Sequence, residues 1–234
     1  MNIELLIDSF FKIIIPGIQI TIPLTIISFS IALVIAILTA IVQVANMPVL
    51  KQLARIYVWF IRGTPLVVQL FIVFFGLPYF NIMLDGYVSA ILVFSINTGA
   101  YASETMRAAI ESIPKGQFEA GYCVGMSYPQ IMIRIILPQA MRTAFPPLSN
   151  SLISLVKDTS LAATITVGEM FLAAQKIVSR TWETFPIYLE LAFVYLLFCT
   201  VLTWLQHYLE KKMELKYVYE LSYQIQNQCL QEQQ

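Results

Sequence analysis

Long apolar runs dominate this chain. Five runs are free of Asp, Glu, Lys and Arg: residues 13–50, 63–84, 86–103, 143–156 and 191–209. The fourth run is short, but it continues the apolar stretch Ile131–Ala140 with Arg142 between them. Since about 20 apolar residues cross a bilayer as a helix, the pattern predicts an all-α, polytopic membrane protein with about five transmembrane helices.

The segment before the first run has a different pattern. From Ile3 to Ile15, apolar side chains such as Phe10 and Ile14 share the sequence with the polar Asp8 and Lys12. That mixture predicts an amphipathic helix in the membrane interface, followed by a break at Pro16-Gly17. The first residues lack the positive charge that begins a signal peptide. The predicted organisation is an interfacial helix over 1–15, a transmembrane domain over 16–214 and a cytoplasmic tail over 215–234.

Positive charge predicts the orientation of the helices. Lys and Arg gather in cytoplasmic loops, and an outside N-terminus with five spans places ten of the fourteen on the inner side. These ten are Lys51, Arg55, Arg62, Arg107, Lys115, Arg134, Arg142, Lys211, Lys212 and Lys216. Only Lys12, Lys157, Lys176 and Arg180 are then outside. We therefore expect the N-terminus out and the C-terminus in.

Composition excludes several classes of function. Hydrophobic residues make up 58% of the 234 residues and charged residues 12%, against about 25% charged in soluble domains. The net charge of zero gives no basic field for nucleic acid. The three cysteines are scattered and His207 is the only histidine, so neither a metal site nor a His-dependent catalytic site is expected.

The loop between the third and fourth runs, residues 111–138, is long and patterned. Pro114-Lys115-Gly116 is expected to end the third span, and Gln117–Met126 to form a short helix. Gly125 allows the positive φ that stops such a helix, and Pro138 is expected where the next helix restarts. Composition alone favours an ordinary surface helix–turn–helix here.

The spacing in this loop resembles the signature loop of bacterial ATP-binding-cassette importer permeases. The matching residues are Glu119, Ala120, Gly121, Gly125, Ile135, Leu137 and Pro138. The one departure is Gly121, where the broad pattern has alanine. In that family the short helix sits in a groove of the ATPase subunit, so the resemblance implies a coupling role for Glu119, Ala120, Gly121 and Gly125.

Three further segments are similar to the permeases for polar amino acids, which serve histidine, glutamine, glutamate, arginine and opines. They are Arg62-Gly63-Thr64-Pro65-Leu66, the stretch from Gly99 to Arg107, and the stretch from Leu137 to Leu161. The resemblance covers about residues 16–214. It implies a type I importer in the bacterial cell membrane with two ATPases that bind ATP and Mg and an extracytoplasmic solute-binding protein. Such importers have two permease subunits, either two copies of one chain, which we expect here, or two different permeases. No cofactor is expected in this chain.

Several polar residues are expected to be structural or gating. Arg62 is either a cytoplasmic anchor or a partner for phosphate or an acid, and Thr64-Pro65 starts a helix because proline tolerates the first turn. Glu104 and Arg107 are three residues apart and can pair on one helical face. Pro138 completes this group.

Candidates for the substrate path are polar residues inside apolar sequence, which usually face a neighbouring helix or a water-filled path. They are Asn97, Thr98, Lys157, Asp158, Thr159, Ser160 and Glu169. Lys157 and Asp158 offer both signs to an amino-acid zwitterion, or form an ion pair that holds a broken segment. Glu169 is a second candidate for the ammonium group.

Other functions remain open alternatives. A permease for another solute, such as methionine, has the same general plan, but the segments from Arg62 and Gly99 argue against it. A stand-alone carrier usually shows repeated halves, and we find no internal repeat. The chain has no Gly-x4-Gly-Lys-Ser/Thr phosphate loop, so a different subunit must supply energy from ATP.

Overall fold

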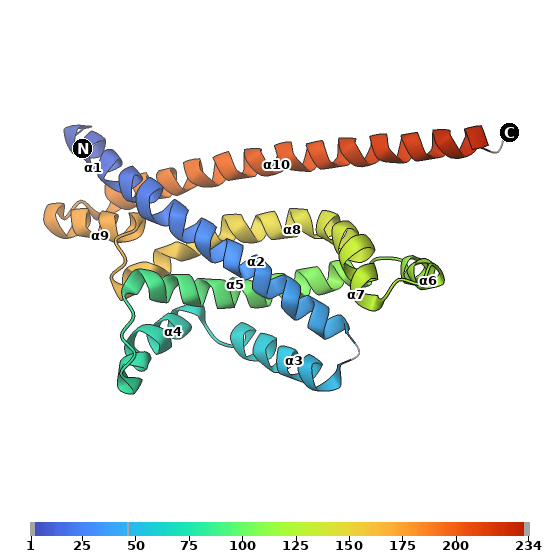
Figure 1. The fold of residues 1–234 in the computed structure, drawn as a ribbon. Helices are drawn as coiled ribbons and strands as arrows, with labels where there is room; N and C mark the ends of the chain where they lie inside the picture. The colour runs from blue at the N-terminus through green and yellow to red at the C-terminus, as the bar shows by residue number, and fades with distance from the viewer. Residues whose placement is uncertain (1–2, 46, 232–234) are drawn as a thin grey trace.

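All regular structure in the described part of the chain is helical (Figure 1). The computed structural model describes residues 3–45 and 47–231, and side chains up to residue 212. The prediction of an all-α protein is confirmed for these residues. The tail was predicted over 215–234. Its residues 215–231 continue the backbone of the last helix, α10 (Thr184–Gln231), and residues 232–234 lie outside the described part of the chain.

The first helix runs without a break. α1 (Ile3–Pro16) continues through a π-helical turn (Gly17–Thr21) into α2 (Ile22–Val44), so the predicted break at Pro16-Gly17 is wrong. A proline is tolerated here because it precedes a π-helical turn, where the hydrogen-bond ladder is already altered. Gly17 is needed for packing: a Cβ there would lie 2.7 Å from the Met170 sulfur. The interfacial position of α1 stays a prediction.

The second apolar run is preceded by a helix where a loop was expected. α3 (Pro48–Arg62) is followed by a break and α4 (Leu66–Phe71), which continues as π- and 3₁₀-helical turns to Phe80. The two parts are bent by 103°. Treating Lys51–Arg62 as a loop was wrong because its charges occupy one face of an amphipathic helix.

The remaining elements, from α5 to α10, are also helical. They are α5 (Gly86–Glu111), α6 (Lys115–Cys123), α7 (Tyr128–Ile131), a π-helical turn (Met132–Ile136), α8 (Leu137–Asp158), a 3₁₀ segment (Thr159–Ile165), α9 (Met170–Thr181) and α10. The helix does not restart at Pro138: α7, the π-helical turn and α8 are continuous. As the second residue of α8, after the π-helical turn, Pro138 does not interrupt the course of the helix.

Two helices of the described residues are long and apolar enough to cross a membrane, Glu4–Val44 and Thr184–Lys212. The number rises to four if each of two bent helix pairs is counted as one span. These pairs are Pro48–Arg62 with Leu66–Phe80, and Tyr128–Ile165 with Met170–Thr181, which is bent by 53°. α5 has 26 residues and lies alongside α2 in the centre of the bundle (Figure 1).

Small side chains allow α2 and α5 to pack closely. Ala32, Ala36 and Ala40 recur every four residues on α2 and are fully buried. Opposite them, a Cβ on Gly99 would lie 2.9 Å from the Ile35 side chain. Such small residues let two helix backbones approach in a membrane, where packing rather than the hydrophobic effect holds helices together. α3 and α8 pack against both helices of this pair, and α4 packs against α5.

Candidate functional site

The break between α3 and α4 is fixed by side-chain hydrogen bonds. Gln69 on α4 donates to the Thr64 carbonyl at 3.2 Å, to its hydroxyl at 2.8 Å and to the Ile61 carbonyl at 2.8 Å. Asn97 on α5 donates to the Gln69 side-chain oxygen at 3.0 Å. The predicted helix start at Thr64-Pro65 is confirmed, with Pro65 in an extended conformation just before α4 rather than in its first turn. Buried polar groups of this kind need hydrogen-bond partners. These bonds therefore hold the break in place and connect it to α5.

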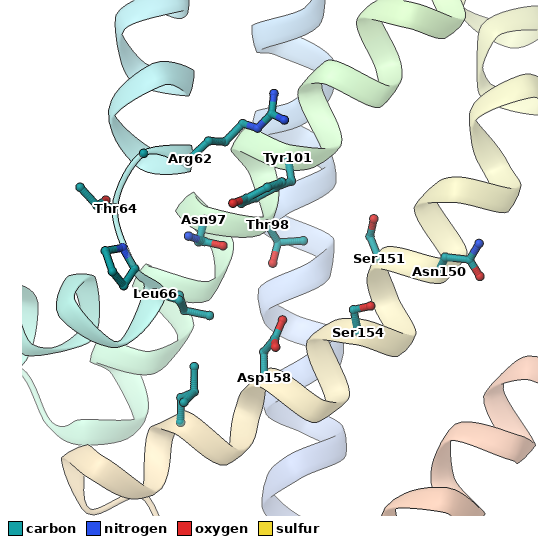
Figure 2. Close-up of a pocket in the computed structure, with 13 residues that line it drawn as sticks. Arg62, Thr64, Leu66, Asn97, Thr98, Tyr101, Asn150, Ser151, Ser154 and Asp158 are labelled. Atoms are coloured by element: carbon teal, nitrogen blue, oxygen red, sulfur yellow. The ribbon is translucent and has the colours of Figure 1, made fainter.

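A cavity of about 680 Å³ lies beside this break, between α3, α4, α5 and α8 (Figure 2). We call it the polar cavity. Its lining residues are Arg62, Gly63, Thr64, Pro65, Leu66, Asn97, Thr98, Tyr101, Asn150, Ser151, Ser154, Asp158 and Leu161. Its volume is in the range of sites for small molecules.

The wall on α8 is a stripe of polar side chains. Ser151, Ser154 and Asp158 are spaced by three and four residues, so they lie on one helical face. Figure 2 shows the Asp158 carboxylate and the Thr98 hydroxyl reaching into the space between α8 and α5. The Asp158 carboxylate makes no salt bridge or hydrogen bond within the described residues. It is therefore available to a cation in the cavity.

The positive charge that complements the Asp158 carboxylate comes from Arg62, at the break between α3 and α4. Arg62 is the last residue of α3, and its guanidinium lies 5.2 Å from the centre of the Tyr101 ring (Figure 2). This is cation–π geometry, which weakly restrains the charge without neutralising it. The cavity thus has a carboxylate on α8 and a guanidinium at the break. Arg62 is placed at the cavity wall rather than in a surface loop.

The structure brings only some of the predicted substrate-path residues together. Asn97, Thr98 and Asp158 line the polar cavity. Lys157 is exposed and does not line it, since neighbouring residues on a helix point about 100° apart. The expected Lys157–Asp158 ion pair is not among the salt bridges of the described residues.

Thr159, Ser160 and Glu169 also lie outside the polar cavity. The two hydroxyls donate to carbonyls of the preceding turn, Thr159 to Val156 and Ser160 to Lys157, both at 2.7 Å. Glu169 is fully buried at the start of α9. It accepts from the Leu172 amide at 2.8 Å and from the Tyr195 hydroxyl at 3.1 Å. A carboxylate satisfied in this way caps a helix and is not open to a substrate.

Sequence reasoning missed five polar residues around the break. Asn150, Ser151 and Ser154 were visible as a polar stripe at helical spacing leading to Asp158, a pattern that could have been found. Tyr101 was quoted only as part of a motif. Gln69 was not singled out, because its role depends on the fold bringing α4 against the end of α3.

The predicted coupling loop forms a short helix beyond the bundle (Figure 1). α6 ends at Cys123, and Gly125 follows with φ 77°, as its residue type predicted. Ser127 begins α7, and its amide donates to the Gln130 side chain at 2.9 Å. Glu119 and Ala120 are exposed, as are Tyr122 and Val124. The outer face of α6 is therefore free to contact another molecule.

Gly121 has an internal reason to be glycine. It is the buried residue of α6, and a Cβ there would lie 2.6 Å from Cγ1 of Ile131 on α7. Gly116, on the same helix, has nothing within 4 Å of its Cβ position. Gly121 therefore sets how closely α6 packs on α7, whereas the face with Glu119 is the one available outside.

The predicted pair Glu104–Arg107 is formed. Arg107 donates to Glu104 at 3.0 Å and to Glu111 at 2.7 Å, and Gln43 on α2 donates to the other Glu104 oxygen at 3.1 Å. This cluster links α2 to the end of α5 that leads into α6. The position is consistent with the structural role expected for the pair.

Comparison with known proteins places these features in one family. Residues 32–215 match the family described as binding-protein-dependent transport system inner membrane component. An L-cystine transport system permease protein of Bacillus subtilis (strain 168) is 48% identical over 212 residues, covering 90% of this chain and 91% of the relative.

Solved structures have the same fold. A chain in the crystal structure of an amino acid ABC transporter with histidines superposes with a TM-score of 0.80 and 28% identity, covering 88% of this chain and 96% of the other. A chain of the MetNI methionine ABC transporter gives 0.70 at 16% identity, with 87% and 95% covered, which shows the fold alone. This multi-pass chain thus belongs to the family of binding-protein-dependent transport system inner membrane components of the bacterial cell membrane.

Proposed function

We propose that this chain is the permease subunit of an ATP-binding-cassette importer for a polar amino acid, with L-cystine as the first candidate. The observation that carries the proposal is the polar cavity, which presents Arg62 on one wall and Asp158 on another. An amino-acid zwitterion carries one group of each sign. The relative at 48% identity is named for L-cystine transport, which selects among the polar amino acids.

The charges define a binding mode. Asp158 would accept from the ammonium group, and Arg62 would hold the carboxylate with its planar set of donors. Thr98, Ser151 and Ser154 add neutral hydrogen-bonding groups between them. A charge in a membrane needs such partners because lipid offers none.

The orientation follows from the same proposal. We infer five spans, the four candidates of the described residues and α5, with the N-terminus outside and the C-terminus inside. This arrangement places α6, the coupling loop 111–138 and most of the Lys and Arg residues in the cytoplasm. The exposed Glu119 and Ala120 then face the ATPase subunit.

The assembly we infer has two copies of this chain, two ATPases and an extracytoplasmic solute-binding protein. ATP and Mg bind the ATPases, and this chain itself carries no cofactor and no catalytic residue. Closure of the ATPases draws the two α6 helices together and opens the cavity outward; hydrolysis reverses the movement. This is alternating access.

Reconstitution tests the proposal. The chain is placed in proteoliposomes with its ATPase subunit and its solute-binding protein, and uptake of labelled L-cystine is followed. We expect accumulation above the outside concentration only with ATP in the ATPase compartment, and competition by polar amino acids in preference to methionine. Accumulation without ATP would show a secondary carrier, and a methionine preference would overturn the substrate assignment.

A further inference from the structure

A second cavity lies between α3 and α5, next to the polar cavity. It has a volume of about 370 Å³ and is lined by Gln43, Lys51, Arg55, Val58, Trp59, Arg62, Glu104, Arg107 and Glu111. We call it the inner cavity. Arg62 lines both cavities, so the two cavities meet at this residue.

The charges in the inner cavity are unbalanced. Both of its carboxylates, Glu104 and Glu111, are already bound by Arg107. The side chains of Lys51 and Arg55 make no hydrogen bond or ion pair with any described residue. The inner cavity therefore holds two cations without partners, in addition to Arg62.

These cations form a line along α3. Lys51, Arg55 and Arg62 are four and seven residues apart, so all three lie near one face of the helix. At 1.5 Å per residue, Lys51 is about 16 Å from Arg62 along the axis. α3 begins at the end of the bundle that carries α6 and ends at the polar cavity (Figure 1). The line connects the polar cavity to that end.

We propose that the inner cavity is an exit site that binds the α-carboxylate of the amino acid after it leaves the polar cavity. Lys51 and Arg55 are its free donors, and Arg62 passes the carboxylate from one cavity to the next. A cleft lined by one sign of charge raises the local concentration of its counter-ion and the rate at which that ion binds, by about ten-fold or more. This inference rests on the proposed function of the polar cavity.

The substitution Lys51→Gln/Arg55→Gln removes both free donors and leaves the polar cavity intact. In the complete reconstituted transporter, we expect uptake of labelled L-cystine to fall about ten-fold. ATP hydrolysis stimulated by the solute-binding protein stays near the wild-type rate, because neither residue lies on α6. The charge-conserving Lys51→Arg/Arg55→Lys is expected to retain most of the uptake.

Lys211→Gln is the matched control, since Lys211 is an exposed cation of α10 outside both cavities; it should change neither measurement. Unchanged uptake in the double glutamine variant overturns the exit site. An equal fall in uptake and ATP hydrolysis also overturns it, because the two residues would then be structural. So does a loss of uptake seen only in liposomes with anionic lipid, which would assign the cations to lipid headgroups.

The wild-type transporter in the same liposomes separates the two proposals. If wild type does not accumulate L-cystine or another polar amino acid, the proposed function fails first. If wild type accumulates it and the double glutamine variant does so equally, only the exit site fails.

Discussion

The coupling loop and the polar cavity are built in opposite ways. The coupling loop is formed by residues that are adjacent in sequence, α6 and Gly125, and the outer face of α6 is exposed. The polar cavity draws Arg62, Asn97 and Asp158 from three parts of the chain. A loop formed by adjacent residues can move as a unit when it contacts another protein. A cavity lined by residues from several helices changes shape whenever those helices shift. The two regions suit the tasks of receiving energy and releasing substrate.

Glu119→Lys should have the largest effect on transport. Reversing a charge at a docking contact weakens binding by about 100-fold or more. We expect transport to be abolished in the reconstituted system, with the protein still in the membrane and substrate still bound by the solute-binding protein. Normal uptake would contradict the placement of coupling at α6.

Asp158→Asn should lower amino-acid uptake by about ten-fold, since a charge-assisted hydrogen bond is replaced by a neutral one. Lys157→Gln is the matched control because Lys157 lies outside the polar cavity, and its uptake should stay near the wild-type level. The measurements are initial rates and the amount of protein per liposome. If Asp158→Asn lowers only protein abundance, Asp158 has a structural role instead.

Gly121→Ala tests whether α6 is held against α7 as the structure shows. The added Cβ meets Ile131, and such overpacking costs about 1–3 kcal/mol. We expect a lower thermal midpoint of the detergent-solubilised protein. Gly116→Ala is the control: its Cβ position is open and alanine favours the helix by up to about 1 kcal/mol. A larger loss in Gly116→Ala than in Gly121→Ala would show that the packing is different.

Glu111→Gln should have the smallest effect. Its side chain is 53% exposed in the pair with Arg107, and exposed pairs contribute about 0.2–1 kcal/mol. We expect a small decrease in thermal midpoint and nearly normal uptake. A strong loss of uptake would mean that the Arg107 cluster takes part in coupling rather than only joining α5 to α2.

The two regions also differ in how far they could be predicted. The positive φ at Gly125 follows from residue type, and the pair Glu104–Arg107 follows from helical spacing. The position of Arg62 could not be predicted, because it depends on a 103° bend between α3 and α4. Gln69 holds this bend, and it is hydrogen-bonded to Asn97, which is distant from it in sequence. Thr159 and Glu169 were assigned to the substrate path for their polarity, but polarity alone does not distinguish a lining residue from a helix cap.

We propose that energy enters at α6 and that substrate passes through the polar cavity. The most direct test is to measure ATP hydrolysis and amino-acid uptake together in reconstituted Glu119→Lys and Asp158→Asn. We predict that Glu119→Lys loses both uptake and the stimulation of ATP hydrolysis by the solute-binding protein, and that Asp158→Asn loses uptake but keeps the stimulation. If both variants lose the two activities in parallel, the separation of the regions is contradicted.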